Sequence, residues 1–205
     1  NYGGGLANCD GNIHHNSITN CSATEYDGAS LWKCNARIDS NILGDNTGFG
    51  IYKSVNTIIS NCIIFNNTDV GMDHCDNTEV INCTFVNNLA AARYCDSCTI
   101  TNSIIWENEA GYKPGTLINC CVQNWSGTEN GCFNEDPLFV NIDTLDLRLT
   151  EDSPCIDTGA TTSITYDYNG VTRPFDGHGA GAGNNAVRMN DTGRPGIVQG
   201  YKSYF

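Results

Sequence analysis

The sequence repeats itself with a period of about twenty residues from near its beginning to about residue 120. One recurring phrase consists of an asparagine that usually follows an aliphatic residue by two places and is itself followed by cysteine, serine or isoleucine. The asparagines of this phrase recur at nearly even intervals, of which only the last is clearly shorter: Asn20, Asn41, Asn61, Asn82, Asn102 and Asn119. Such a period is typical of a solenoid, in which each repeat stacks on the next.

A second phrase lies between the copies of the first and has a similar period. Its last positions also recur evenly after a longer first interval: Cys9, Cys34, Ser54, Cys75 and Cys95. Both phrases are too short for a helix and alternate as strands do. We therefore predict an all-β chain, a right-handed parallel β-helix of about six coils of about twenty residues. The coils are expected over residues 1–132.

Equivalent residues of successive coils should lie one above the other, about 4.8 Å apart. The asparagines of the first phrase are then predicted to form a ladder, in which each side-chain amide bonds to the next along the axis. The position after each asparagine is predicted to point into the core. These positions are Cys21, Ile42, Cys62, Cys83, Ser103 and Cys120.

Twelve cysteines are present, and eight of them fall into two columns of the repeat. One column is Cys9, Cys34, Cys75 and Cys95, and the other is Cys21, Cys62, Cys83 and Cys120. We interpret both as stacks of buried free thiols, because in-register parallel strands seldom have disulfide geometry. Oxidation of neighbours remains the alternative. Outside the columns, Cys132 and Cys155 are the candidate disulfide, whereas Cys95-x-x-Cys98 lacks the partners of a metal site.

The period fails after residue 124, and residues 133–205 are predicted to cap the last coil within the same domain. This part contains Asp136-Pro137-Leu138-Phe139, then Ser153-Pro154-Cys155-Ile156-Asp157-Thr158-Gly159, then Asp167-Tyr168-Asn169-Gly170 with Arg173-Pro174. An end coil needs such a cover because unpaired strand edges promote aggregation. Residues 177–196 are expected to wrap back along the helix.

These motifs, together with the repeated phrases, resemble secreted and cell-surface parallel β-helix repeat proteins of bacteria and archaea, within the pectate-lyase-like fold superfamily. The resemblance covers nearly the whole chain. It implies the fold and an extracellular or cell-surface location, and it implies little about activity.

Charge and hydropathy narrow the range of partners. Ten Lys and Arg against 23 Asp and Glu give a formal net charge of −13, which disfavours nucleic-acid binding. No apolar run is long enough for a membrane span. Residues 3–9, at the start of the first coil, include no charge or proline to block strand pairing. We expect an upstream β-helix region or another copy of the chain to stack there.

The residues just before each cysteine-column position form a predicted outward stripe that could bind a polysaccharide. It combines aromatic and charged side chains: Trp32, Lys33, Tyr52, Lys53, Asp73, His74, Arg93 and Tyr94. A solvated mixed face is the simplest interpretation, followed by ligand binding. A polysaccharide lyase site is less well supported, because only one carboxylate is present, and no catalytic residue is assigned.

Two further clusters could bind metals. Asp167, Asn169 and Asp176 could hold a structural Ca²⁺, although a tight turn explains them equally well. His14 and His15 should point in opposite directions along a strand, which favours plain surface polarity. No other cofactor is expected.

The sequence therefore favours a non-catalytic structural or interaction protein that can assemble end to end. The alternatives are a carbohydrate-binding module and a polysaccharide lyase that acts on an acidic glycan. An apolar stripe would support self-association if it were exposed. Its members are Leu43, Ile63, Phe65, Val86, Ile104 and Trp106.

Overall fold

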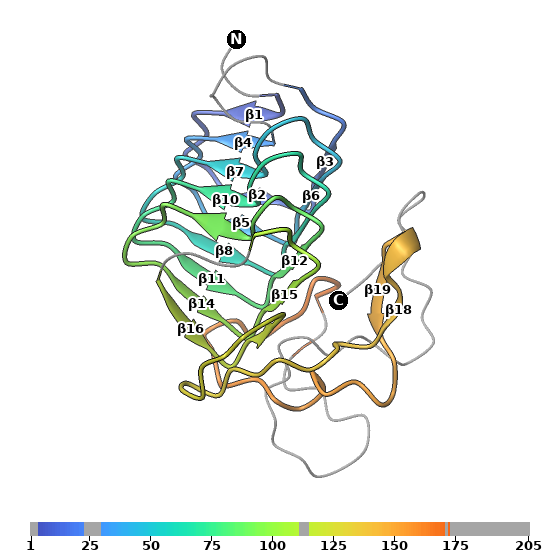
Figure 1. Cartoon of the computed structure of the whole chain (residues 1–205). Helices are drawn as coiled ribbons and strands as arrows, with labels where there is room; N and C mark the ends of the chain where they lie inside the picture. Colours follow the sequence, from blue (N-terminus) through green and yellow to red (C-terminus); the bar gives the residue numbers. More distant parts are fainter. Residues whose placement is uncertain (1–3, 23–29, 111–114, 171, 173–205) are drawn as a thin grey trace.

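The computed structural model of the chain describes residues 4–22, 30–110, 115–170 and 172. Its short strands stack in parallel into a solenoid (Figure 1), which confirms the predicted β-helix. Three parallel sheets run along the solenoid, with five, six and six strands. The single helix among the described residues is a short 3₁₀ turn, η1 (Ile142–Thr144).

Each of the first five coils contributes one strand to each sheet, in the chain order sheet A, sheet B, sheet C, and the sixth contributes described strands to sheets B and C. Sheet A consists of β1 (Leu6–Ala7), β4 (Leu31–Trp32), β7 (Ile51–Tyr52), β10 (Met72–Asp73) and β13 (Ala92–Arg93). Sheet B consists of β2 (Ile13–His14), β5 (Ile38–Asp39), β8 (Ile58–Ser60), β11 (Glu79–Ile81), β14 (Thr99–Thr101) and β16 (Thr116–Ile118). Sheet C consists of β3 (Ser17–Thr19), β6 (Ile42–Gly44), β9 (Ile63–Phe65), β12 (Thr84–Val86), β15 (Ile104–Trp106) and β17 (Cys121–Val122).

Aliphatic residues at equivalent positions form the interior. In sheet B, Ile38, Ile59, Val80 and Ile100 pair in register, and none of them is exposed. In sheet C the inward column runs through Leu43, Ile64, Phe85 and Ile105. Each coil thus buries the apolar residues of its neighbour, which explains why one coil could not be stable alone.

The predicted asparagine ladder lies at the corner between sheets B and C. Its column contains residues with positive φ, namely His15, Ser40, Asn61, Asn82, Asn102 and Asn119. Asn tolerates this left-handed backbone better than most residues. The amide contacts along the column are long, at 3.5 Å for Asn82 to Asn61 and 3.4 Å for Asn102 to Asn82. The ladder is therefore present, but it is weak.

Two assignments in this ladder are wrong. Because Asp39 pairs with Ser60, it is Ser40 that aligns with Asn61, so Asn41 aligns with the inward Cys62. Asn20 belongs to the next corner, after sheet C, because Thr19 pairs with Gly44. For the same reason Cys21 aligns with Asn46 and not with Cys62. The backbone N–H of Cys21 donates a hydrogen bond to Asn46 Oδ1 at 2.8 Å, in agreement with this register.

The stronger asparagine ladder lies at the corner after sheet C, on its inward side. Asn46, Asn67 and Asn88 each donate from Nδ2 to Oδ1 of the next asparagine, at 2.9, 2.9 and 3.1 Å, and the ladder ends at Asn108. The first three side chains are at most 2 % exposed. The even spacing of these four asparagines is a sequence signal that could have located the ladder.

The cysteines of the corner columns do more than fill space. The backbone N–H of Cys62 donates to Cys83 Sγ at 3.4 Å, and Cys62 Sγ donates to Ser60 O at 3.2 Å. Ser103 performs the same role for the N–H of Cys83, at 3.1 Å. Cysteine, serine and asparagine are thus alternatives for one task, which is to satisfy the backbone at a buried corner.

The C-terminal part passes beneath the last coil and then lies against the side of the solenoid (Figure 1). Its hairpin, β18 (Phe139–Asn141) and β19 (Asp146–Leu149), packs on the outer face of sheet C. Leu147 contacts the cluster of Ile42, Ile63, Phe65 and Val86. The predicted apolar stripe is therefore covered by the chain itself, and Leu43 is not part of it, because Leu43 lies in the inner core.

Residues 158–168, called the strap below, run back along the corner between sheets B and C. Their contacts lie on successively earlier coils: Asn119 Nδ2 to Thr158 O at 3.0 Å, Asn102 Nδ2 to Ala160 O at 2.8 Å and Asn61 Nδ2 to Tyr166 O at 3.2 Å. The return along the solenoid that we expected of residues 177–196 is made here by the strap. Residues 177–196 themselves lie outside the described part of the chain.

The predicted disulfide between Cys132 and Cys155 is wrong. Cys132 continues the inner column beside Cys120, because Phe133 pairs with Cys121. Cys155 lies on the outer side of sheet C with Cys121 and Ile104. The two cysteines therefore face different sides of the coil wall, and all twelve cysteines are free thiols in the structure.

Candidate functional site

The eight residues of the predicted stripe come together on the outer side of sheet A. Register pairs align Trp32, Tyr52, Asp73 and Arg93 in one column. The next residue of each coil has positive φ and forms a second column, made of Lys33, Lys53, His74 and Tyr94. The solenoid thus places two parallel rows of side chains, with successive members about 4.8 Å apart along its axis.

The aromatic part of this stripe differs from the expectation. Trp32 and Tyr52 are only 8 % and 7 % exposed, because Phe49, Val70 and Ala90 pack over this part of the sheet. Phe49 stacks on Tyr52 with ring centroids 4.5 Å apart. Trp32 and Tyr52 therefore offer no open surface in the predicted stripe, and Tyr94 is its exposed aromatic residue, at 59 %.

The second column presents charge. The ammonium groups of Lys33 and Lys53 lie 4.5 and 4.7 Å from the centroids of the Trp32 and Tyr52 rings. Neither lysine forms an ion pair with the described residues. The buried aromatic rings therefore support the two lysines by cation–π contact while their charge faces solvent.

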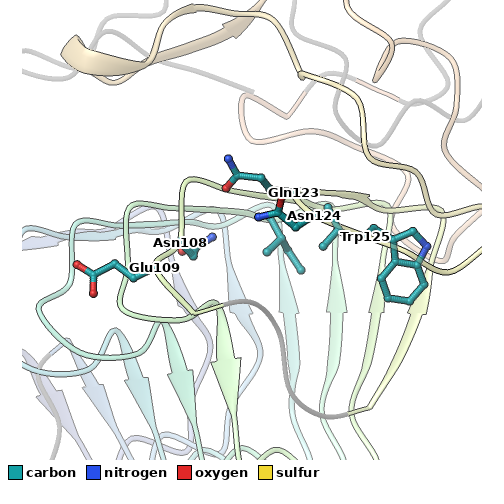
Figure 2. A pocket seen from close by; sticks show the side chains of 7 residues that line it. Asn108, Glu109, Gln123, Asn124 and Trp125 are labelled. Atoms are coloured by element: carbon teal, nitrogen blue, oxygen red, sulfur yellow. The ribbon is translucent and has the colours of Figure 1, made fainter.

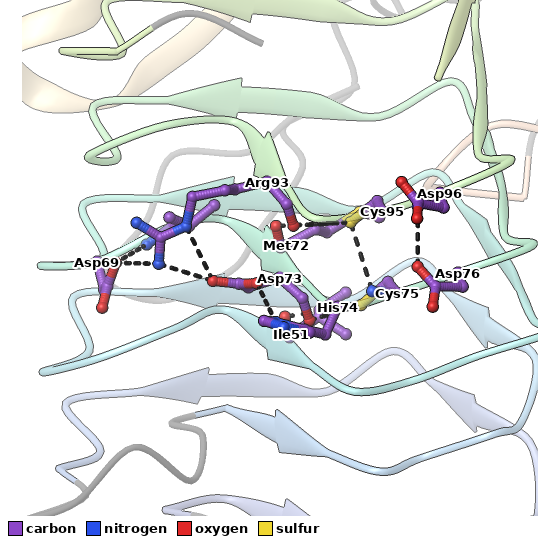
Figure 3. A network of polar contacts seen from close by, with 11 residues as sticks. Ile51, Asp69, Met72, Asp73, His74, Cys75, Asp76, Arg93, Cys95 and Asp96 are labelled. Atoms are coloured by element: carbon purple, nitrogen blue, oxygen red, sulfur yellow. Dashed lines mark hydrogen bonds and ion pairs between the residues drawn. The ribbon is translucent and has the colours of Figure 1, made fainter. Parts of the chain in front are cut away.

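Asp73 is the centre of a polar network on this face (Figure 3). Its carboxylate is 1 % exposed and accepts hydrogen bonds from Arg93 Nε at 3.1 Å and Arg93 Nη2 at 2.7 Å. His74 Nδ1 lies 2.5 Å from the other carboxylate oxygen. Arg93 also contacts Asp69 at 3.5 Å. Burial lowers the pKa of Arg93, but its bonds to Asp73 and that carboxylate's charge raise it by more.

The network fixes the orientation of His74. Because Nδ1 is occupied by Asp73, Nε2 is the ring nitrogen that remains for a ligand. The ring lies between Tyr52 and Tyr94, with centroid distances of 5.7 and 5.1 Å, and the side chain is 48 % exposed. A histidine held in this way can donate a hydrogen bond to a ligand or exchange a proton with it.

A cavity of about 230 Å³ lies at the end of the inner asparagine ladder (Figure 2). The coil from Asn102 to Asn119 is shorter than the coil from Asn82 to Asn102. The register of β15 and β17, continued by three residues, places Trp125 after Asn108 in the column of the inner asparagine ladder. The repeat did not predict this cavity, although the shortened interval was a signal. The lining residues are Ile105, Asn108, Glu109, Val122, Gln123, Asn124 and Trp125.

Comparison with known protein families identifies one match. A family model described as a right-handed β-helix region matches residues 1–133. The chain belongs to the right-handed β-helix family. No curated protein and no solved structure matches it.

This β-helix protein has no group of three potential metal-ligating side chains among its described residues. Asp167 and Asn169 form a turn, in which the Asn169 amide donates to Asp167 Oδ1 at 2.8 Å. Asp176, the third residue of the predicted Ca²⁺ site, lies outside the described residues. His14 and His15 do not point apart as expected, because positive φ at His15 brings their Nδ1 atoms to 3.2 Å.

In the part of the β-helix protein that the structure describes, no helix has the length and apolar character that a membrane span requires.

Proposed function

We propose that this β-helix protein is a non-catalytic structural and interaction protein of the cell surface or extracellular space. The observation that carries the proposal is the row of Lys33, Lys53, His74 and Tyr94, in which Lys53 is half-buried and the other three are exposed, held at equivalent positions of successive coils. The backbone corners and the buried residues beneath the row support it rigidly. Such a scaffold can bind an extended partner at little cost in conformational entropy.

The state of Asp73 supports binding over catalysis. Both carboxylate oxygens are occupied, one by Arg93 and one by His74, and the group is buried. A general base or a Ca²⁺ ligand needs a carboxylate that can reach the substrate or the ion. Asp73 therefore acts as a support for Arg93 and His74 in this proposal.

An acidic polysaccharide is the ligand class that the row favours. Lys33 and Lys53 are unpaired cations among the described residues of a chain whose formal net charge is −13. Successive coils are about 4.8 Å apart, which resembles the separation of consecutive sugars in an extended chain. Tyr94 offers an exposed ring on which one sugar could stack.

A polysaccharide lyase is the alternative, and it is favoured by the orientation of His74, whose Nδ1 is held by Asp73. Nε2 of His74 could remove the proton beside a uronate carboxylate, and Lys53 could stabilise the charge that develops. The two functions differ in their product, because a lyase releases unsaturated uronates that absorb ultraviolet light.

The test is binding to polygalacturonate and to a neutral glucan, measured by affinity electrophoresis together with ultraviolet absorbance. We expect Lys33→Ala, Lys53→Ala and Tyr94→Ala each to weaken polygalacturonate binding about tenfold. Arg148→Gln removes a cation from β19, away from the row, and should leave binding unchanged. Equal weakening by Arg148→Gln, or no binding to any glycan of a broader panel, would refute the glycan proposal.

End-to-end assembly has separate support. The strands β1, β2 and β3 each pair with one described neighbour, so one edge of the first coil has no described strand beside it. Parallel pairing with another coil would satisfy that edge. Sedimentation across a range of salt concentrations tests this, because screening of the net charge should strengthen assembly. A constant mass of one chain would contradict it.

A further inference from the structure

Cys121 differs from the cysteines of the inner columns in its position. It begins β17 and pairs with Ile104, whose side chain lies on the outer side of sheet C. Cys155, from the C-terminal part, packs in the same buried cluster as Cys121 and Ile104. The two residues are 2 % and 1 % exposed.

The contact joins two regions that do not share the repeat. In the inner columns, three thiols accept a backbone N–H of the neighbouring coil: Cys62 from Asn41, Cys83 from Cys62 and Cys95 from Cys75. No such N–H bond to Cys121 Sγ is found among the described residues, and this thiol instead donates to Glu135 O at 3.1 Å. Oxidation of the inner pairs would disturb corner hydrogen bonds, whereas oxidation of Cys121 with Cys155 would instead remove the bond that the Cys121 thiol donates to Glu135 O.

The backbone around Cys155 is also held in place. Its N–H donates to Ser153 Oγ at 3.2 Å, and Ser153 Oγ donates to Pro137 O at 2.6 Å. These bonds fix the turn that presents the Cys155 thiol to β17. A thiol pair held in fixed positions loses little further entropy when it becomes covalent.

We propose that Cys121 and Cys155 form a disulfide that fastens the C-terminal part of the chain to the last coil when the protein folds under oxidising conditions. The oxidant is a small-molecule disulfide such as oxidised glutathione. The thiolate of one cysteine attacks it and releases one glutathione. The other thiolate then attacks the mixed disulfide and releases a second glutathione, so the two protein hydrogens leave with two glutathione thiols.

The timing follows from burial. Contact with Cys155 and burial both raise the pKa of the Cys121 thiol, so the folded thiol is a poor nucleophile. Exchange therefore takes place while the C-terminal part docks. Once formed, the bond is shielded from soluble reductants by the same burial.

The bond has a structural consequence for the outer face of sheet C. The hairpin and the strap follow Cys121 in the chain, and the hairpin covers Ile63, Phe65 and Val86. With the bond in place, release of this cover requires a larger opening of the structure. We expect proteolysis within residues 137–168 to be about tenfold slower in the oxidised protein than in the same protein refolded with reductant.

The test is mass spectrometry of the full chain after refolding in a glutathione redox buffer. The protein is alkylated in denaturant without reductant and then digested. Two of the twelve cysteines should escape alkylation, and a peptide containing Cys121 should be linked to one containing Cys155. Because Cys120 lies in the same peptide, variants must separate the two residues.

Cys121→Ser and Cys155→Ser should abolish the linked peptide and remove the difference in proteolysis. Cys120→Ser, the adjacent control, should retain both. Full alkylation of Cys121 and Cys155 in the refolded wild-type protein would overturn the proposal. A link from Cys155 to any other cysteine would overturn it equally.

Discussion

The solenoid and the strap solve the same problem, that of satisfying buried backbone groups, in opposite ways. In the solenoid each coil donates to a side chain of the coil that follows it, so one corner design recurs with Asn, Cys or Ser at the inward position. The strap has no repeating partner and is held by separate contacts at Asn119, Asn102 and Asn61. Repetition gives the solenoid stability that is shared among neighbours, whereas the strap depends on a few bonds.

This difference predicts how each region responds to mutation. Removal of an inner corner group leaves buried donors and acceptors unpaired in two coils at once, and the whole repeat array is affected. Removal of a strap contact should release the strap locally and leave the solenoid folded. We therefore expect the effects of substitution to decrease from the inner ladder to the strap.

Asn67→Ala should have the largest effect, a loss of about 3 kcal/mol or more in the free energy of unfolding. Asn67 accepts from Asn46 and donates to Asn88 and to Leu43 O, at distances between 2.9 and 3.2 Å. Alanine would leave these buried groups without partners. Chemical denaturation followed by circular dichroism measures the change.

The neighbouring Asn66 provides the matched control. Its backbone has φ of 48°, and its side chain donates to Asp45 Oδ1 near the surface. Asn66→Gly retains the left-handed backbone without a Cβ and should cost about 1 kcal/mol or less. Equal losses for the two variants would mean that the inner ladder is not the stabilising element.

The period predicted the fold, the sheet A columns and the buried cysteines, because these depend on local repetition. It failed to place Asn20 correctly, because two different corners carry asparagine at almost the same interval. It placed Asn41 one position off, because Ser40 takes the ladder position in that coil. A search by spacing can pass from one corner to the other without a break. The long interval between Cys9 and Cys34 shows that the first coil is longer than the others. The interval between Asn20 and Asn41 is not lengthened in the same way, and this mismatch was a signal that Asn20 belongs to another corner.

The cover of sheet C could not be predicted from the repeat. It joins residues such as Phe65 and Leu147, which are distant in the chain and share no periodic pattern. The same limitation applies to the candidate site. The repeat correctly predicted that Trp32 and Tyr52 lie on the outer face of sheet A. Their burial could not be predicted, because it depends on Phe49 and Val70, which lie outside the two repeated phrases.

Asn102→Gly should have the second-largest effect, and that effect should be confined to the strap. Asn102 donates to Ala160 O at 2.8 Å and accepts from the Ala160 N–H at 2.7 Å. Loss of both bonds should destabilise strap docking by about 2 kcal/mol. Hydrogen exchange of residues 158–168 measures it. Asn82→Gly is the control, because the Asn82 side chain has only the two long amide contacts among the described residues, and strap exchange should hardly change.

Tyr166→Phe should loosen the same strap by about 1 kcal/mol. The Tyr166 hydroxyl accepts from Arg37 Nη2 at 2.6 Å and donates to Asp39 Oδ2 at 3.4 Å. The ring stays in place, so packing is retained and only the two polar contacts are lost. Hydrogen exchange should quicken near residue 166, whereas the midpoint of global unfolding should stay constant. A shift of that midpoint would show that strap and solenoid unfold together.

Cys62→Ser should have the smallest effect, within about 1 kcal/mol of wild type. The hydroxyl can accept the N–H of Asn41 and donate to Ser60 O, as Cys62 Sγ does at 3.4 and 3.2 Å. Ser103 already serves this role at an equivalent corner. Cys62→Val provides the contrast, because valine fills the space without accepting the N–H, and a loss of about 2 kcal/mol is expected. If valine were tolerated as well as serine, the inner cysteines would act only as apolar filling, and the shared corner design would be refuted.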